Sequence, residues 1–177
     1  MDNEEIVMSS YIGVKLINAR PMNRVDYNNL RGWKLPEDEN GLDDGFLVEY
    51  IDGGKTNTEM YTGYVSWSPK DVFEKAYKKT TGMTFGLAIE ALKKGLKVSR
   101  VGWNGKGMYL WLMPSAEVKA EWCKELHLKE LAEQNGGSIL ALGSIRMYTH
   151  DSTGRKAILT GWLASQSDML AEDWEII

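Results

Sequence analysis

The stretch TFGLAIEALKKGLKVSRVGWNGKGMYLWLM, residues 84–113, holds the clearest secondary-structure signals of the chain. Its first part predicts a helix, because apolar residues recur with the spacing i, i+3, i+4 and i+7. These residues are Phe85, Ala88, Ile89 and Leu92. Thr84 can cap the start of the helix, and Gly95 can end it in the left-handed conformation. We therefore predict a short helix with one apolar stripe.

The second part of the same stretch predicts a β-hairpin. Residues 96–103 alternate as a strand, the sequence NGKG follows, and residues 108–113 return as a second strand. Asn104 and Gly105 both tolerate the positive φ that a type I′ turn requires, so we place the turn there. Alternation in the returning strand sends Tyr109 and Trp111 to the same side.

The remaining chain adds further strands and helices. Strands are expected over residues 11–20, 46–51 and 64–67, in two runs joined by the turn DSTG at 151–154, and at the C-terminus. A helix is expected over residues 68–79, with Ser68 as N-cap and Pro69 at its first position. A third helix is expected over residues 115–135, and the sequence SQSD at 165–168 should cap a short turn.

Together these elements predict an α+β fold with small antiparallel sheets and packed helices. The best boundary lies near residues 80–83, where the sequence TTG interrupts the pattern. We expect an N-terminal α+β accessory domain of unknown role over residues 1–80 and a second domain over residues 83–177.

Composition limits the classes of partner. The chain has 177 residues, 43% of them hydrophobic, and a formal net charge of −4. Nucleic acids and anionic membranes would be repelled at long range, so we expect neither DNA, RNA nor a membrane as partner. The acidic N-terminus lacks the pattern of a signal peptide, and the single cysteine, Cys123, cannot form an intrachain disulfide. A cytoplasmic protein is expected.

No catalytic or metal-binding motif is complete. Lys106 between two glycines lacks the rest of a phosphate-binding loop, and His127 and His150 have no partners at metal spacing. The acids Asp168, Glu172 and Asp173 fit a solvated surface turn better than an acid/base pair. We therefore expect no enzyme, no cofactor and no metal.

One combination of side chains fits a nucleotide ligand. Arg100, Trp103, Asn104 and Lys106 surround the predicted hairpin, and the segment GWLASQSD, residues 161–168, adds further aromatic and polar groups. Arginine can pair with phosphate and tryptophan can stack on a base. Aromatic hairpins are more commonly part of a core, so both interpretations stay open.

Two long strings resemble a known family. The string MTFGLAIEALKKGLKVSRVGWNGKGMYLWLMP, residues 83–114, and the string GWLASQSDMLAEDW, residues 161–174, look like the Thoeris anti-defence protein 2 family of phages. The resemblance covers residues 83–177, and residues 1–80 resemble phage segments sometimes found ahead of this domain. The intervening residues 115–143 carry little of the family's pattern.

The resemblance implies a sponge rather than an enzyme, acting in the cytoplasm of an infected bacterium. Family members bind cyclic ADP-ribose isomers, especially glycocyclic ones made by TIR-domain proteins, and so starve the defence effector of its signal. Some also hold cyclic dinucleotides at a second site. They are similar in forming homotetramers with pockets between protomers.

The resemblance also implies a set of ligand-binding residues. These are Arg100, Trp103, Asn104, Gly105, Tyr109, Ser165, Gln166 and Asp168. Side-chain chemistry suggests that Trp103 stacks on a base and Arg100 meets pyrophosphate, while Asn104 and Asp168 address ribose hydroxyls.

Two other functions remain as alternatives. A phosphodiesterase would use Asp168, Glu172 or Asp173 to degrade the signal. A protein-interaction module would use the aromatic hairpin as a contact surface for a host protein.

Overall fold

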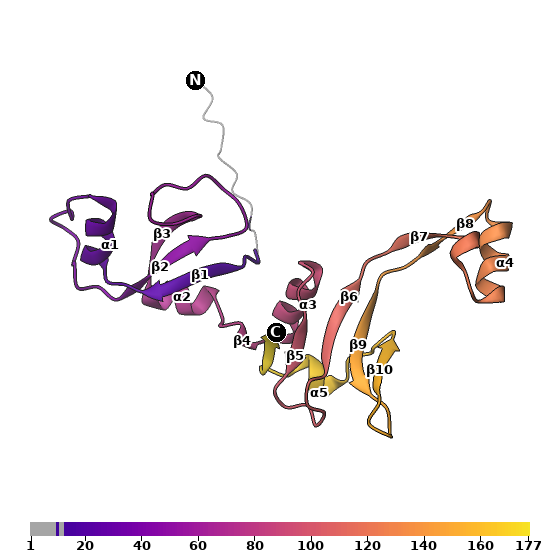
Figure 1. Cartoon of the computed structure of the whole chain (residues 1–177). Helices are drawn as coiled ribbons and strands as arrows, with labels where there is room; N and C mark the ends of the chain where they lie inside the picture. The colour runs from indigo at the N-terminus through magenta and orange to yellow at the C-terminus, as the bar shows by residue number, and fades with distance from the viewer. Residues whose placement is uncertain (1–9, 11–12) are drawn as a thin grey trace. The chain divides into compact units, whose positions relative to one another are not determined.

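The computed structural model describes residue 10 and residues 13–177. The chain divides into two compact units, Met1–Lys78 and Lys79–Ile177 (Figure 1). Both units combine helices with small antiparallel sheets, which is consistent with the predicted α+β class. Within the described part of the chain, every helix is too short or too polar to span a bilayer.

The first unit is a three-stranded antiparallel sheet of order β1-β2-β3 with two helices. Its elements are β1 (Ile17–Pro21), α1 (Arg24–Arg31), β2 (Gly45–Tyr50), β3 (Tyr64–Pro69) and α2 (Lys70–Ala76). Tyr27, Leu47 and Val65 form its buried apolar cluster. The strand predicted over residues 11–20 is found only from Ile17, and its first two positions lie outside the described residues.

The helix predicted over residues 68–79 begins later and ends earlier than expected. Ser68 and Pro69 belong to β3, where they pair with Phe46 and Gly45 of β2. Helix α2 therefore starts at Lys70, and its N-cap Pro69 provides no side-chain cap. The prediction of Ser68 as N-cap is wrong because pairing with β2 extends the strand through both residues, and a proline is tolerated at a strand end.

The second unit is built on a six-stranded antiparallel sheet of order β10-β9-β6-β5-β11-β4. Its strands are β4 (Thr81–Met83), β5 (Val98–Arg100), β6 (Tyr109–Met113), β9 (Ser144–His150), β10 (Lys156–Thr160) and β11 (Trp174–Ile176). Two helices accompany this sheet, α3 (Phe85–Lys93) and α5 (Gln166–Met169). A separate two-stranded sheet pairs β7 (Ala116–Lys119) with β8 (Ser138–Ala141).

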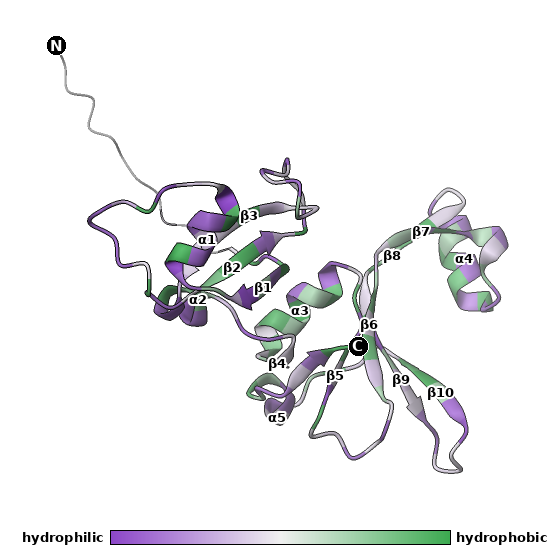
Figure 2. Ribbon diagram, turned by 60° about the vertical axis from the view of Figure 1, so that its left-hand side comes forward, coloured by the Kyte–Doolittle hydropathy of each residue, from purple (hydrophilic) through white to green (hydrophobic). Residues whose placement is uncertain are grey.

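Helix α3 confirms the helix that was predicted from the apolar spacing after Thr84. The Thr84 side chain accepts a hydrogen bond from the Leu87 N–H at 3.4 Å, and Gly95 follows the helix with φ +81°. Ala88 and Leu92 are buried against Trp174, Val98 and other core residues, and Phe85 and Ile89 pack at the edge of this cluster. Figure 2 shows α3 beside the large sheet, and it contacts β5, β6 and β11.

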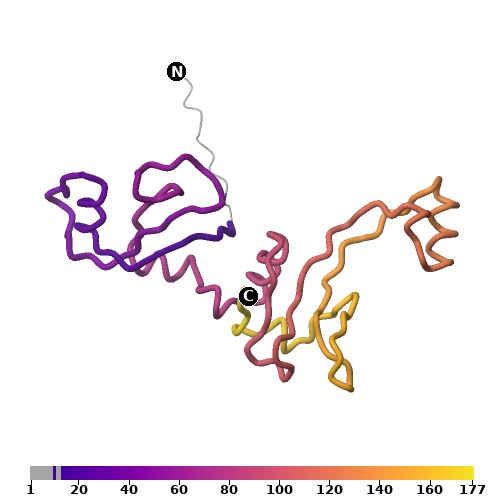
Figure 3. Tube along the Cα trace, in the orientation of Figure 1, coloured from indigo at the N-terminus to yellow at the C-terminus, as the bar shows by residue number. Residues whose placement is uncertain are grey.

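The predicted tight hairpin is wrong. Strand β5 pairs with β6 only through Val98 and Leu110, and residues 101–108 form an open loop between them (Figure 3). Among the described residues only glycines have positive φ, so Asn104 cannot occupy a type I′ turn. The loop is instead held by partners outside the hairpin, because the Gly102 N–H donates to Asp173 and the Trp103 indole N–H donates to Asp168.

The segment predicted as a helix over residues 115–135 is helical only in its second half. Its first residues form β7, followed by a 3-10 turn, Ala120–Trp122, and then α4 (Leu126–Gln134). The long-range partner β8 takes residues 116–119 into a strand, which local composition does not reveal. Helix α4 ends at Gln134, close to the predicted end at residue 135, and Gly136 and Gly137 follow it with positive φ.

Other turn predictions near the C-terminus are confirmed. Asp151 and Gly154 lie in the turn that joins β9 to β10, and the terminal strand is present as β11. Strand β4 includes residues 81 and 82, although residues 80–82 were expected to interrupt the regular structure. It is only three residues long and pairs irregularly with β11, so it carries no alternation that a sequence pattern would show.

Candidate functional site

Helix α5 begins with a capping box that its own sequence provides. The Asp168 backbone N–H donates to the Ser165 hydroxyl at 3.1 Å, and the Ser165 N–H donates to the Asp168 carboxylate at 3.0 Å. The Ser165 hydroxyl also donates to Asp168 Oδ2 at 2.6 Å. This confirms that the sequence SQSD caps the following turn. It also fixes one carboxylate oxygen of Asp168.

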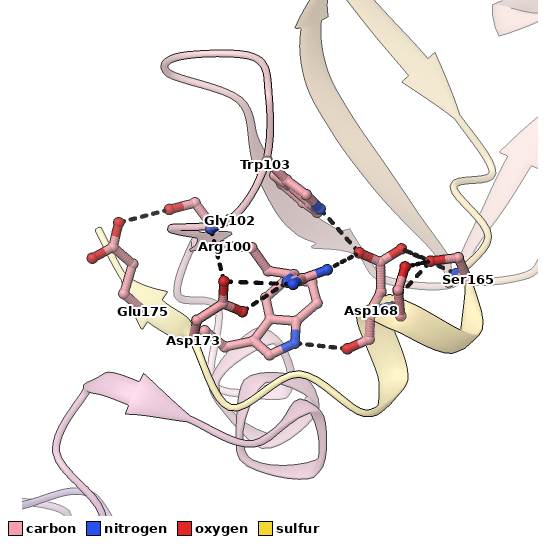
Figure 4. A network of polar contacts seen from close by, with 10 residues as sticks. Arg100, Gly102, Trp103, Ser165, Asp168, Asp173 and Glu175 are labelled. Carbon is pink, nitrogen blue, oxygen red and sulfur yellow. Dashed lines mark hydrogen bonds and ion pairs between the residues drawn. The ribbon is translucent and has the colours of Figure 1, made fainter.

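Arg100, the last residue of β5, joins two segments that lie far apart in the sequence. Its Nη1 donates to Asp168 Oδ1 at 2.8 Å, and its Nε donates to Asp173 Oδ1 at 2.8 Å (Figure 4). The guanidinium therefore links β5 to the start of α5 and to the residue that precedes β11. Both carboxylates raise the pKa of Arg100, Asp173 more than Asp168.

Asp168 is the centre of the network. It is 8% exposed, and its Oδ1 accepts a second hydrogen bond, from the Trp103 indole N–H at 3.0 Å. Burial alone would raise the pKa of Asp168, but hydrogen bonds from Ser165, Trp103 and Arg100 outweigh burial and hold the pKa well below its ordinary value. Each carboxylate oxygen thus has two donors, and the group stays ionised.

Asp173 holds the loop of residues 101–108 at its first turn. Its Oδ2 accepts a hydrogen bond from the Gly102 backbone N–H at 2.7 Å. The hydrogen bond from Arg100, helped by this N–H, lowers the pKa of Asp173 against the opposing effect of burial. A Cβ on Gly102 would lie 2.7 Å from the same oxygen, so the position has no room for a larger residue.

Trp103 belongs partly to the core. Its ring meets Trp162 edge-to-face at a centroid distance of 6.1 Å and Trp174 at 5.4 Å, and it is half-buried. One end of the indole is therefore fixed by Asp168, while part of its surface remains accessible. Tryptophan often combines an apolar body with a bonded N–H in this way.

The structure brings four of the predicted ligand-binding residues together and places the others around or away from them. Arg100, Trp103, Ser165 and Asp168 form one network. Asn104 and Gln166 are exposed in the loop and in the first turn of α5. Gly105 lies against the side chain of Met108, because a Cβ on Gly105 would lie 2.6 Å from Met108 Sδ.

Tyr109 lies on the other face of the sheet. Its neighbour Leu110 is fully buried in the core beneath α3, so Tyr109 points the opposite way and stacks on Tyr148 at a centroid distance of 5.0 Å.

Sequence reasoning missed three contributors to this site. Asp173 entered only as a possible acid, and Gly102 and Trp162 were not singled out. Trp162 and Asp173 lie inside the second quoted string, but their contacts with Trp103, Arg100 and Gly102 span about sixty or more residues, so no local pattern indicates these contacts.

The chemistry available here is hydrogen bonding and stacking. Hydroxyls of Ser165 and Ser167, amides of Asn104 and Gln166, and indole surface surround an internally paired set of charges. Among the residues that the structure describes, no three His, Cys, Asp or Glu side chains are placed to hold a metal ion.

Comparison with known proteins places the second unit in a family. Residues 83–177 match the model of the Thoeris anti-defense 2-like domain. The chain is also 35% identical over 97 residues to Thoeris anti-defense 2 of Bacillus phage SP01, and this match covers 55% of the chain and 97% of that protein. The loop of residues 101–108, α5 and the network between them all lie within the matched domain. The chain therefore belongs to the Thoeris anti-defense 2-like family.

Proposed function

We propose that this protein is a phage anti-defence protein that binds and sequesters cyclic ADP-ribose-type signals, glycocyclic ADP-ribose in particular. TIR-domain proteins of the infected bacterium make these signals, and the protein holds them uncleaved in the cytoplasm. The observation that supports this most strongly is the joining of both family strings at one place. Arg100 and Trp103 of the first string bond Asp168 of the second.

The network suggests a division of roles within the site. The hydrogen-bonding groups of Arg100 and Asp168 are used within the protein, so we assign them to positioning rather than to direct contact with pyrophosphate or ribose. The contact residues in this proposal are Trp103, which stacks on a base, and the exposed Asn104 and Gln166, which reach ribose or base edges.

The same geometry supports binding over hydrolysis. A general acid or base works best when its pKa lies near the operating pH. Asp168 and Asp173 both have lowered pKa values and accept hydrogen bonds from Arg100, so they are weak bases held in place. Glu172, between them in the sequence, is exposed.

The decisive experiment follows the fate of the ligand. The protein is incubated with glycocyclic ADP-ribose, filtered to remove free ligand, and heat-denatured, and the released molecules are identified by mass spectrometry. Recovery of intact ligand supports sequestration. Loss of ligand with new products would instead indicate a phosphodiesterase, and Glu172→Ala would then be expected to abolish turnover.

The proposal includes a homotetramer and a second class of ligand, cyclic dinucleotides. Light scattering of the purified protein measures the first. For the second, a cyclic dinucleotide is titrated into protein saturated with glycocyclic ADP-ribose. Binding without displacement indicates two separate sites, and displacement indicates one shared site.

A protein-interaction module remains a second candidate, because apolar side chains are exposed next to the site. Leu163 is 88% exposed and Leu170 is 79% exposed, on either side of α5. Such residues are typical of contact surfaces. Calorimetry that detects no binding of cyclic nucleotides, together with a host protein retained by the wild type and lost by Leu163→Ser, would favour this function.

A further inference from the structure

The outer face of the large sheet, opposite α3, carries an apolar patch on strands β6, β9 and β10. Strand β6 reads YLWLM without a polar residue. Antiparallel strands with one solvated face usually alternate between apolar and polar residues, and continuous apolar runs are typical of strands covered on both sides. Leu110 is covered by the core, so Tyr109 and Trp111 face outward.

Neighbouring strands extend this outer face. Tyr148 lies opposite Tyr109 and stacks on it, and Ile158 of β10 lies opposite Tyr148. Ile158 is 61% exposed. A contiguous row of aromatic and apolar side chains therefore runs across three strands, and such exposed rows are typical of interaction surfaces.

A cation in this face lacks an acceptor. Arg146 of β9 lies opposite Trp111 of β6. The Nε of Arg146 is buried without a hydrogen-bond partner among the described residues. The terminal nitrogens of the same guanidinium carry further N–H donors, which an acceptor placed on this face can reach. The occupant of this face should therefore supply an anion next to an apolar surface.

The same face of the sheet carries a suitable anion nearer its other edge, on β11. Glu175 on β11 lies opposite Ser99 of β5, accepts a hydrogen bond from it at 3.1 Å, and is half-buried. Since the strand order is β9-β6-β5-β11, Arg146 and Glu175 are three strand spacings apart across the sheet, about 14 Å, and two residue positions apart along the strands. They are too distant to pair within one chain.

We propose that this outer face packs against the same face of a second copy, and that Arg146 of each copy pairs with Glu175 of the other. A two-fold axis along the strands, between β6 and β5, places β9 of one copy over β11 of the other. Sheets commonly pack face to face at about 10 Å with their strands nearly aligned, and a two-fold interface is self-complementary. Strands β9 and β10 of one copy, which carry Arg146 and Lys156, thus face the strand of the other copy that carries Glu175.

This inference rests on the self-association included in the proposed function, and mass measurements test it separately from ligand binding. Full-length wild type, Arg146→Glu, Glu175→Arg and the double exchange are compared by sedimentation across a range of concentrations. Each single variant should weaken association by about tenfold or more, because it places like charges together, and the double exchange should recover most of it. Lys93→Glu on α3, on the other side of the sheet, is the matched control and should not change association.

Folding is controlled in two ways. Near-ultraviolet circular dichroism reports whether each variant keeps its core. Ile158→Lys changes an exposed side chain on the same face, so it should weaken association without disturbing the fold.

A wild type that stays monomeric, single variants that associate normally, or a double exchange that fails to recover would each overturn the proposed pairing. Wild type that binds glycocyclic ADP-ribose as a monomer would refute this interface and the proposed homotetramer but not the sequestration, and an associating wild type that binds no ligand would refute only the sequestration.

Discussion

At the scale of single residues, Asp168 organises the candidate site. Arg100, Trp103 and Ser165 all donate to its carboxylate, so one buried anion sets the position of three elements. Hydrogen bonds to a charged group are stronger than neutral ones, and they limit how far each partner can move. The result is a surface whose groups have little conformational freedom, which favours the proposed binding.

Trp103 should show two separable effects. Trp103→Ala is expected to weaken binding of glycocyclic ADP-ribose by about 1–3 kcal/mol through lost stacking. It should also reduce stability, because the ring packs on Trp162 and Trp174. Calorimetry on the folded fraction measures the first effect, and urea unfolding measures the second. Trp103→Phe keeps an aromatic face and should retain more affinity. Normal affinity in the folded fraction of Trp103→Ala would assign the ring to the core alone.

The network should also make stability depend on acid pH. In the folded state the pKa values of Asp168 and Asp173 are lowered. In an unfolded chain the pKa of an aspartate is about 3.9. Their contribution is therefore fully present above that pH and is lost as pH falls through the folded-state values. Thermal unfolding between about pH 6 and pH 2 should show a falling midpoint.

Asp168→Asn provides the control for this pH dependence. Asp151 and Glu49 also have lowered pKa values, so the wild type alone does not isolate the network. The difference in midpoint between wild type and Asp168→Asn should shrink as the pH falls below about 4. A difference that stays constant with pH would contradict the assignment.

At the scale of elements, the conformation of the loop of residues 101–108 depends on Asp173, which precedes β11, rather than on a turn within the loop. The Gly102 N–H is held by Asp173, and the side chain of Trp103 reaches α5. The sequence predicted the strands on either side and the apolar stripe of α3. The loop conformation was mispredicted, because the Asn-Gly pair suggests a tight turn while the partners that open the loop come from residues 168 and 173.

Gly102→Ala should displace this loop. A Cβ there would meet Asp173 Oδ2 at 2.7 Å and Arg100 Nη2 at 3.3 Å, so the Asp173 bond to the loop must move. We expect a loss of about 1–3 kcal/mol in unfolding free energy, and weaker ligand binding. Gly86→Ala in α3 is the matched control, since its Cβ would meet only the Thr84 hydroxyl at 3.9 Å and alanine favours a helix. Equal stabilities for the two variants would refute the role given to Gly102.

At the scale of the whole molecule, the two units have separate cores. Tyr27, Leu47 and Val65 form one cluster, and the other surrounds Trp174 and Leu110. The family match begins at Met83, after the chain has entered the second unit. The relative from Bacillus phage SP01 is matched over 97% of its own length by 97 residues of this chain.

The second unit should therefore fold and bind by itself. A protein consisting of residues 79–177 is expected to unfold cooperatively and to retain the ligand affinity of the full chain. Circular dichroism with urea and calorimetry with glycocyclic ADP-ribose measure these properties, with the full chain as reference. A fragment that folds but binds at least about tenfold more weakly would show that the first unit contributes to the site.

Local sequence determined the elements whose signals lie within a few residues. Helix α3 with its Thr84 cap, the capping box of Ser165 and Asp168, and the glycine stop after α4 depend on neighbouring backbone groups and on short-range periodicity. Only the tertiary structure decided the conversion of residues 116–119 to a strand, the open loop after Arg100 and the placement of Tyr109 on the outer face. Each of these depends on a strand or carboxylate far along the chain, and the free energy of those contacts exceeds the weak local preference for a helix or a tight turn.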